Sequence, residues 1–211
     1  ISIEFDKTYK VKDYNYNFNG NITKSRIRFN QPIKNKLLSG TIDEIFFSDL
    51  KIKTIIDPKN LNFNGNGRYS FDNINFLNIN FYNNFKKESS NFNLDFEYSY
   101  NLNLDLINFQ KSKDSVANLS INMEQIKDNF KINKFKYEEQ KNLIEISGLI
   151  LKGDKLLSFN KILIKTDNND FIIQNGKKII IKGKRFDASN LSKYFGKKNE
   201  KNFFQEIDNK I

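Results

Sequence analysis

The chain has 211 residues, with 35 lysines and arginines against 25 carboxylates, and therefore a net charge of +10. It contains no histidine and no cysteine, which excludes a Cys/His zinc site, a histidine-based catalytic triad, a catalytic thiol and a disulfide. No glycine-rich phosphate loop, HExxH or GxSxG motif occurs, so we expect no enzymatic activity, cofactor or metal site. The 34 asparagines and only four arginines indicate an A/T-rich gene, so the charge from lysine is weak support for a nucleic-acid partner.

Alternation of apolar and polar residues, which is typical of strands, begins near the N-terminus. Tyr14, Tyr16 and Phe18 alternate with asparagines. Residues 42–50 fit both helical and strand spacing, but residues 50–56 alternate directly afterwards. We therefore predict a strand over this part of the chain.

Glycines and a change of apolar phase interrupt the alternation in the next segment. Apolar residues on either side of Gly65-Asn66-Gly67 predict a turn at this tripeptide. The phase switches by one residue at Phe76-Leu77, where we predict a β-bulge. The pentapeptide Asn-Phe-Asn-Gly-Asn occurs at 17–21 and again at 62–66. Both a repeated strand unit and a coincidence in an asparagine-rich chain stay open.

The longest alternation runs from Phe92 to Leu106. Its apolar members are Phe92, Leu94, Phe96, Tyr98, Tyr100, Leu102, Leu104 and Leu106, and every residue between them is polar. This pattern predicts one strand with an apolar face and a solvated face. At ~3.3 Å per residue the strand would extend roughly 50 Å, well beyond the usual length of about 5–6 residues.

Shorter strands are predicted in the second half, where residues 119–123 and 130–137 alternate. Residues 161–185 indicate a meander of antiparallel strands, because the polar turns between its apolar runs are too short for crossover helices. One of these turns contains Asn175-Gly176, a dipeptide that predicts a type I′ turn.

The pattern becomes helical near the C-terminus. Asp187 is a suitable N-cap for residues 188–195, and a second amphipathic stretch follows. We therefore divide the chain into a β-rich groove domain, 1–186, and a C-terminal helical segment, 187–211. No apolar run is long enough for a transmembrane helix or a signal peptide. Because the first residue is Ile1 rather than Met, we expect a piece of a longer protein.

These elements predict a mostly β fold: a long, curved antiparallel sheet, open as a groove, with a short C-terminal helix. An uninterrupted apolar track in such a groove would shield acyl chains from water. The predicted lining consists of Phe92, Leu94, Phe96, Tyr98, Tyr100, Leu102, Leu104 and Leu106, with Tyr14, Tyr16 and Phe18.

Two other functions stay open. The apolar face can be the closed core of a structural or adhesive β-domain, or lysines and aromatic rings can bind nucleic acid. A Tyr98→Asp or Leu102→Asp substitution separates the first two interpretations. It should lower lipid occupancy without unfolding an open groove, and it should unfold a closed core.

Residues 179–191, Ile-Ile-Ile-Lys-Gly-Lys-Arg-Phe-Asp-Ala-Ser-Asn-Leu, resemble the closing strand and helix of a domain in large AsmA-like proteins of Gram-negative envelopes. In these proteins a strand ends in Gly-x-x-Phe/Leu-Asp and an amphipathic helix begins. The resemblance implies non-enzymatic phospholipid transport between the inner and outer membranes by a bridge-like β-groove in the periplasm. It also implies an inner-membrane anchor outside this chain, no catalytic residues and no specific nucleic-acid partner. The chain departs from the family in being poorer in Leu, Val, Ala and Arg.

Overall fold

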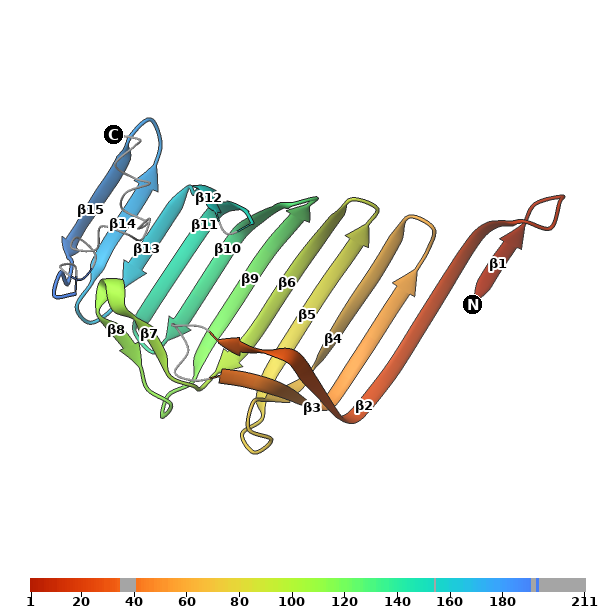
Figure 1. The fold of residues 1–211 in the computed structure, drawn as a ribbon, viewed down its shortest axis with the longest axis horizontal. Coiled ribbons are helices and arrows are strands. Elements are labelled where there is room, and N and C mark those ends of the chain that lie inside the picture. Colours follow the sequence, from red (N-terminus) through yellow and green to blue (C-terminus); the bar gives the residue numbers. More distant parts are fainter. Residues whose placement is uncertain (35–40, 154, 191–192, 194–211) are drawn as a thin grey trace.

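One open antiparallel sheet forms the body of the structure, a computed structural model that describes residues 1–34, 41–153, 155–190 and 193 (Figure 1). Thirteen strands belong to it, in the order β1-β2-β3-β4-β5-β6-β9-β10-β11-β13-β14-β15, with β12 pairing β11 beside this path. The remaining strands, β7 and β8, form a separate two-stranded sheet. The first and last strands of the order do not pair with each other, which confirms the predicted open, mostly β fold.

The strands are β1 (Ser2–Phe5), β2 (Val11–Lys34), β3 (Thr41–Ile56), β4 (Asn60–Ser70), β5 (Leu77–Lys86), β6 (Ser89–Tyr98), β7 (Leu102–Leu104), β8 (Phe109–Lys111), β9 (Ala117–Ile126), β10 (Asn129–Glu139), β11 (Asn142–Lys152), β12 (Lys155–Ser158), β13 (Lys161–Lys165), β14 (Asp170–Asn175) and β15 (Ile179–Arg185). A 3-10 helix, η1 (Asp105–Ile107), lies between β7 and β8.

The strand prediction for residues 42–56 is confirmed by β3, but the turn at Gly65-Asn66-Gly67 is wrong, because these residues lie inside β4. Both glycines instead make room for a neighbour. A Cβ on Gly65 would lie 2.5 Å from the ring of Phe81, and a Cβ on Gly67 would lie 2.7 Å from the Cα of Leu50. Glycine inside a strand here marks close approach of a neighbouring residue rather than a turn.

The β-bulge predicted at Phe76-Leu77 is also wrong. The chain leaves the sheet after β4 and returns at the start of β5. Asp72 holds the connection, because its Oδ1 accepts hydrogen bonds from the backbone N–H groups of Ile74 and Asn75, both at 2.8 Å. This is the local bonding of an Asx turn. The phase switch in the sequence therefore records a loop between two strands.

A bulge does occur in β3, where pairing with β4 shifts between Ser48 and Lys51. Asp49, within this bulge, has a left-handed φ of 53°. Beyond Phe46 the strands β2 and β3 pair only with each other, and they leave the sheet as a two-stranded arm (Figure 1).

The two copies of Asn-Phe-Asn-Gly-Asn lie in register on either side of β3. Thr54 pairs with Phe18 on β2 and with Phe63 on β4, and Ile52 pairs in the same way with Gly20 and Gly65. Each copy therefore presents its Phe and its Gly on the same face of the sheet, which supports a repeated strand unit.

Substitution of Gly67 tests the close approach of β3 and β4. Because the Cβ of Gly67→Ala would meet the backbone of Leu50, the strands must move apart. We expect the free energy of unfolding to fall by about 1–3 kcal/mol, measured by urea denaturation. In the control Gly176→Ala, where the nearest atom would be 3.9 Å from the Cβ, the change should stay within about 0.5 kcal/mol. Equal effects at both positions would contradict this explanation.

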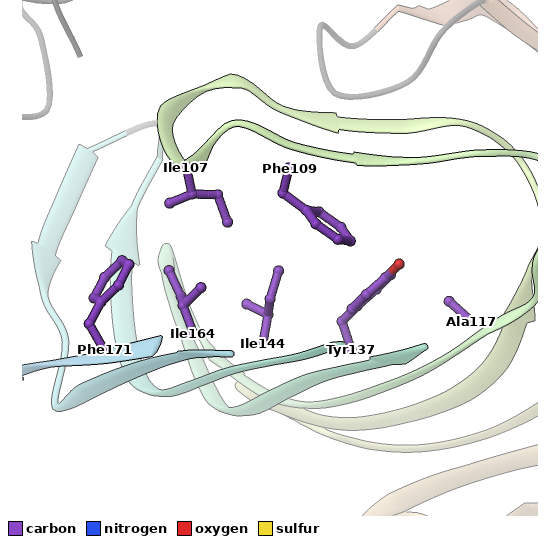
Figure 2. Packing of buried hydrophobic residues seen from close by; sticks show 7 residues of the cluster. All are labelled: Ile107, Phe109, Ala117, Tyr137, Ile144, Ile164 and Phe171. Carbon is purple, nitrogen blue, oxygen red and sulfur yellow. The ribbon is translucent and has the colours of Figure 1, made fainter. Parts of the chain in front are cut away.

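The single long strand predicted over residues 92–106 is wrong. β6 ends at Tyr98, and the chain then folds back as β7, η1 and β8, a unit that we call the covering hairpin (Leu102–Lys111). In Figure 2 it lies above the sheet and directs Ile107 and Phe109 toward Tyr137, Ile144 and Ile164. The alternation of apolar and polar residues continues from β6 into the hairpin although the strand ends at Tyr98. Both elements bury one side, so both have an apolar residue at every second position.

The meander predicted over residues 161–185 is confirmed by β13, β14 and β15. The type I′ turn is wrong, because neither Asn175 nor Gly176 has a positive φ. At the predicted helix start, Asp187 Oδ1 accepts a hydrogen bond from the Ser189 backbone N–H at 3.0 Å, as an N-cap does. The rest of the predicted C-terminal helical segment falls almost entirely outside the described residues.

Candidate functional site on the apolar face of the sheet

An uninterrupted apolar row crosses the sheet from β2 to β15. In antiparallel pairs, directly opposite residues share a face, so the register identifies its members. We call it the central row: Gly20, Ile52, Gly65, Phe81, Leu94, Ile121, Phe135, Ile146, Ile162, Ile173 and Ile181. At about 4.8 Å per strand the row is roughly 48 Å long. No polar side chain interrupts it.

Two further rows flank the central row on the same face. The outer row consists of Phe18, Thr54, Phe63, Asn83, Phe92, Met123, Ile132 and Leu149, and is interrupted by Thr54 and Asn83. The inner row consists of Ile79, Phe96, Leu119, Tyr137, Ile144, Ile164 and Phe171. The central row therefore offers the longest continuous apolar path.

The covering hairpin closes part of the inner row. Tyr137 is 1% exposed under it, and Ile144, Ile164 and Phe171 are buried beside Ile107 and Phe109 of the hairpin (Figure 2). Central-row residues at its margin pack against this cluster but stay partly exposed. From β3 to β9 the side chains of the central row, Ile52, Phe81, Leu94 and Ile121, are partly exposed, while Gly65 is buried beneath the ring of Phe81.

The predicted lining residues on β6 fall into the three rows. Phe92 lies in the outer row, Leu94 in the central row and Phe96 in the inner row, and all three are partly exposed. On β2, Phe18 is 59% exposed in the outer row. Tyr14 and Tyr16 share its face, with their ring centroids 5.4 Å apart.

The other predicted lining residues lie outside the open face. Tyr98 is buried, and its hydroxyl donates a hydrogen bond to the carbonyl of Asn101 at 3.1 Å. Burial, with a smaller effect of Tyr100, raises the pKa of Tyr98 to about 12. The ring of Tyr100 packs 5.0 Å from that of Phe71. The remaining predicted residues, Leu102, Leu104 and Leu106, belong to the covering hairpin and pack against the buried cluster.

The direction of the apolar path also differs from the prediction. The sequence predicted a track along one strand, whereas the continuous track runs across eleven strands, so most of its members were not among the predicted lining residues. Ile121, Ile146, Ile162 and Ile173 were missed. Alternation shows which face of its own strand each of these side chains lies on. It does not show that they lie opposite one another on neighbouring strands, which depends on the pairing register.

Asparagine side chains hold the covering hairpin against the sheet. Asn169, 1% exposed, donates from Nδ2 to the carbonyl of Ile107 at 2.8 Å, while its Oδ1 accepts from the backbone N–H of Asp187 at 2.9 Å. Asn108 of the hairpin donates to Asp187 Oδ2 at 2.9 Å, and Asn190 donates to the carbonyl of Asp105 at 3.0 Å. These bonds join η1 to two other segments of the chain.

A buried polar network lies under the other end of the hairpin. Lys111, 3% exposed, donates to the carbonyls of Ser112 and Ser115 at 2.7 and 2.5 Å. Burial lowers the pKa of Lys111, although nearby carboxylates oppose the shift. The hydroxyl of Tyr137 donates to Glu139 at 2.6 Å, and burial, reinforced by this bond, raises the pKa of Tyr137 far above its ordinary value. The donors are paired within the protein, so the network supports the hairpin.

Removing the Asn169 side chain tests this attachment. In Asn169→Ala, the Ile107 carbonyl and the Asp187 N–H both lose their partner. We expect the free energy of unfolding to fall by about 1–3 kcal/mol, and amide exchange over residues 102–111 to accelerate. In the control Asn168→Ala, at an exposed neighbouring position, both should be nearly unchanged. Equal protection of the hairpin in both variants would contradict the attachment.

The opposite face of the sheet is polar. Its asparagines bond across strands, as Asn122 does with Asn93 and Asn84 with Asn62. An open hollow of about 720 Å³ on this side is lined by charges of both signs, among them Lys51, Arg68 and Asp95. Within the described ranges, no group of three or more carboxylates is arranged to hold a metal ion. The apolar face is therefore the better candidate site.

The chain matches no protein-family model, no curated protein and no solved structure. In the part of the chain that the structure describes, no helix combines the length and apolar character needed to cross a bilayer.

Proposed function

We propose that the chain binds acyl chains of lipids on the open part of its apolar face and handles phospholipid without catalysis. The observation that carries the proposal is the central row, continuous over eleven strands and partly exposed to water. A sheet with one apolar face ordinarily buries that face against a second layer, because exposed apolar surface costs free energy. An acyl chain lying along the row would cover the strands that it spans and shield their apolar side chains from water.

The resemblance of residues 179–191 to AsmA-like proteins supports a place for this activity. In that setting the chain would be a section of a periplasmic bridge that carries phospholipid between the inner and outer membranes, held to the inner membrane by an anchor elsewhere in the protein. The short pitch between strands favours such transport, because equivalent apolar positions recur at about 4.8 Å and a lipid can advance in small steps.

The alternative of a structural or adhesive domain has one observation in its favour. Under the covering hairpin the apolar face is a closed core, with Ala117 fully buried and Tyr137 nearly so. The closed-core interpretation therefore suits the part of the face under the hairpin, and lipid binding suits the rest.

Lipid extraction tests the proposal. The chain is expressed in bacteria, purified without detergent, and examined by native mass spectrometry and by extraction of bound lipid. We expect phospholipid to co-purify and to be displaced by excess fatty acid. A protein that emerges empty, and that stays empty after incubation with phospholipid vesicles, would overturn the proposal.

A further inference from the structure

The turns of the sheet divide into two rims with different charge. Besides the β1–β2 turn, one rim carries the β3–β4, β5–β6, β9–β10, β11–β12 and β14–β15 connections, as Figure 1 shows along its upper edge. Each of these five connections, with the strand residues beside it, contains at least one exposed lysine. The exposed lysines at these connections are Lys59, Lys86, Lys87, Lys127, Lys152, Lys155, Lys177 and Lys178. We call this set the cationic rim.

Few carboxylates offset these lysines. Asp57, Glu88 and Asp128 lie at the same turns, and the sequence adds Asp154 between Lys152 and Lys155, outside the described residues. Among the described contacts of these eight lysines, the single ion pair joins Lys127 Nζ to Glu88 Oε2 at 3.6 Å. Among the described residues, most of these ammonium groups therefore have no carboxylate partner.

The opposite rim has no such excess of basic residues. Counted in the same way, with the strand residues beside each connection, it carries Asp72, Asp105, Asp114, Glu139, Asp167, Asp170 and Asp187 against Lys111, Lys113, Lys141, Lys165 and Arg185. Lys141 is paired with Asp167 at 2.5 Å. The arm of β2 and β3 leaves this side with charges of its own, and Glu44 there binds Arg28 at 2.6 Å. An excess of lysine codons alone would enrich both rims equally.

The apolar face extends up to the cationic rim. Phe85, 44% exposed, lies on this face next to Lys86. Leu151, in the same row by the register, lies next to Lys152. A molecule whose apolar part lies on the central and outer rows would reach the ammonium groups with its polar end. Paired connections recur every two strands, at about 10 Å, so such sites would be repeated along the rim.

We propose that the cationic rim binds the anionic headgroups of lipids whose acyl chains lie on the apolar face, so that the chain prefers anionic to zwitterionic phospholipid. This rests on the proposed function. A basic side chain near an anionic headgroup contributes enough attraction, about 1 kcal/mol, to give roughly a fivefold preference from one contact. The opposite rim, where acidic and basic residues nearly balance, offers the same headgroups no comparable attraction.

A competition experiment tests the headgroup preference. The purified chain is incubated with vesicles of equal amounts of phosphatidylglycerol and phosphatidylcholine with the same acyl chains, and protein-bound lipid is quantified by mass spectrometry. We expect phosphatidylglycerol to be enriched about fivefold or more at low ionic strength. The enrichment should shrink at high salt, where exposed charges are screened.

Two variants with the same change in net charge locate the effect. In K86Q/K87Q/K177Q/K178Q, which removes half of the eight rim lysines, the enrichment should fall to about half or less, while total bound lipid stays near the wild-type amount. The control K51Q/K53Q/K134Q/K182Q removes four lysines from the polar face and should keep the preference. Equal loss in both variants, or none in the rim variant, would overturn the rim assignment.

The wild-type protein distinguishes the two proposals. Equal uptake of both lipids would overturn the headgroup preference but leave the proposed function standing, whereas uptake of neither lipid would overturn both.

Discussion

Replacing Phe109 with alanine should lower the free energy of unfolding by about 3–4 kcal/mol, the largest stability loss expected for a single truncation in this chain. Phe109 is 7% exposed in the covering hairpin, and its ring meets that of Tyr137 edge-on with centroids 5.8 Å apart. The substitution leaves a cavity between the hairpin and the sheet (Figure 2). It also reopens part of the inner row to water, since the hairpin covers it. Urea denaturation followed by circular dichroism measures the loss.

The matched control for this prediction is Phe18→Ala. Phe18 is 59% exposed on the open face, so its truncation should cost less than about 1 kcal/mol. Losses of equal size in the two variants would contradict the division of the apolar face into a covered and an open part. A small loss in both would show that the hairpin contributes little to stability.

The strands could be predicted because alternation is a local property. A strand that packs one face against apolar residues has an apolar residue at every second position, as β10 has at Phe135 and Tyr137. The face of each side chain was therefore accessible from sequence, as was the order of the meander at residues 161–185. What alternation cannot give is register, because a shift of the whole strand by two residues preserves the pattern. The central row depends on register, so its course across the sheet could not be predicted.

The end of a strand was equally hard to predict where the next element keeps the same pattern. Leu102 and Leu104 continue the alternation of β6, yet they belong to a hairpin that faces the sheet from above. The reversal occurs at Ser99–Asn101, where the Tyr98 hydroxyl binds the Asn101 carbonyl, and no glycine or proline marks it. Gly65 and Gly67 show the converse case. Glycine, usually a signal of turns, is used there for close approach inside a strand.

The position of the hairpin changes which substitution tests lipid binding. Tyr98 and Leu102 lie in or against the covered part, so Tyr98→Asp and Leu102→Asp should unfold the protein, by several kcal/mol, whatever the rest of the face does. Leu94 is the better position. It lies in the central row between Phe81 and Ile121, is partly exposed, and is not part of the buried cluster.

Leu94→Asp should reduce co-purifying phospholipid about tenfold, with a loss of unfolding free energy of about 1–2 kcal/mol that leaves the protein folded. A carboxylate in the middle of the row must keep its hydration, and an acyl chain cannot lie across it without removing that water. The matched control is Asn93→Asp, which adds the same charge one residue away on the polar face of β6. It should keep its lipid, since Asn93 contacts Asn122 on that face rather than the apolar row. Equal lipid content in both variants would remove the central row as the binding path, and unfolding of Leu94→Asp would show that this part of the face is a closed core.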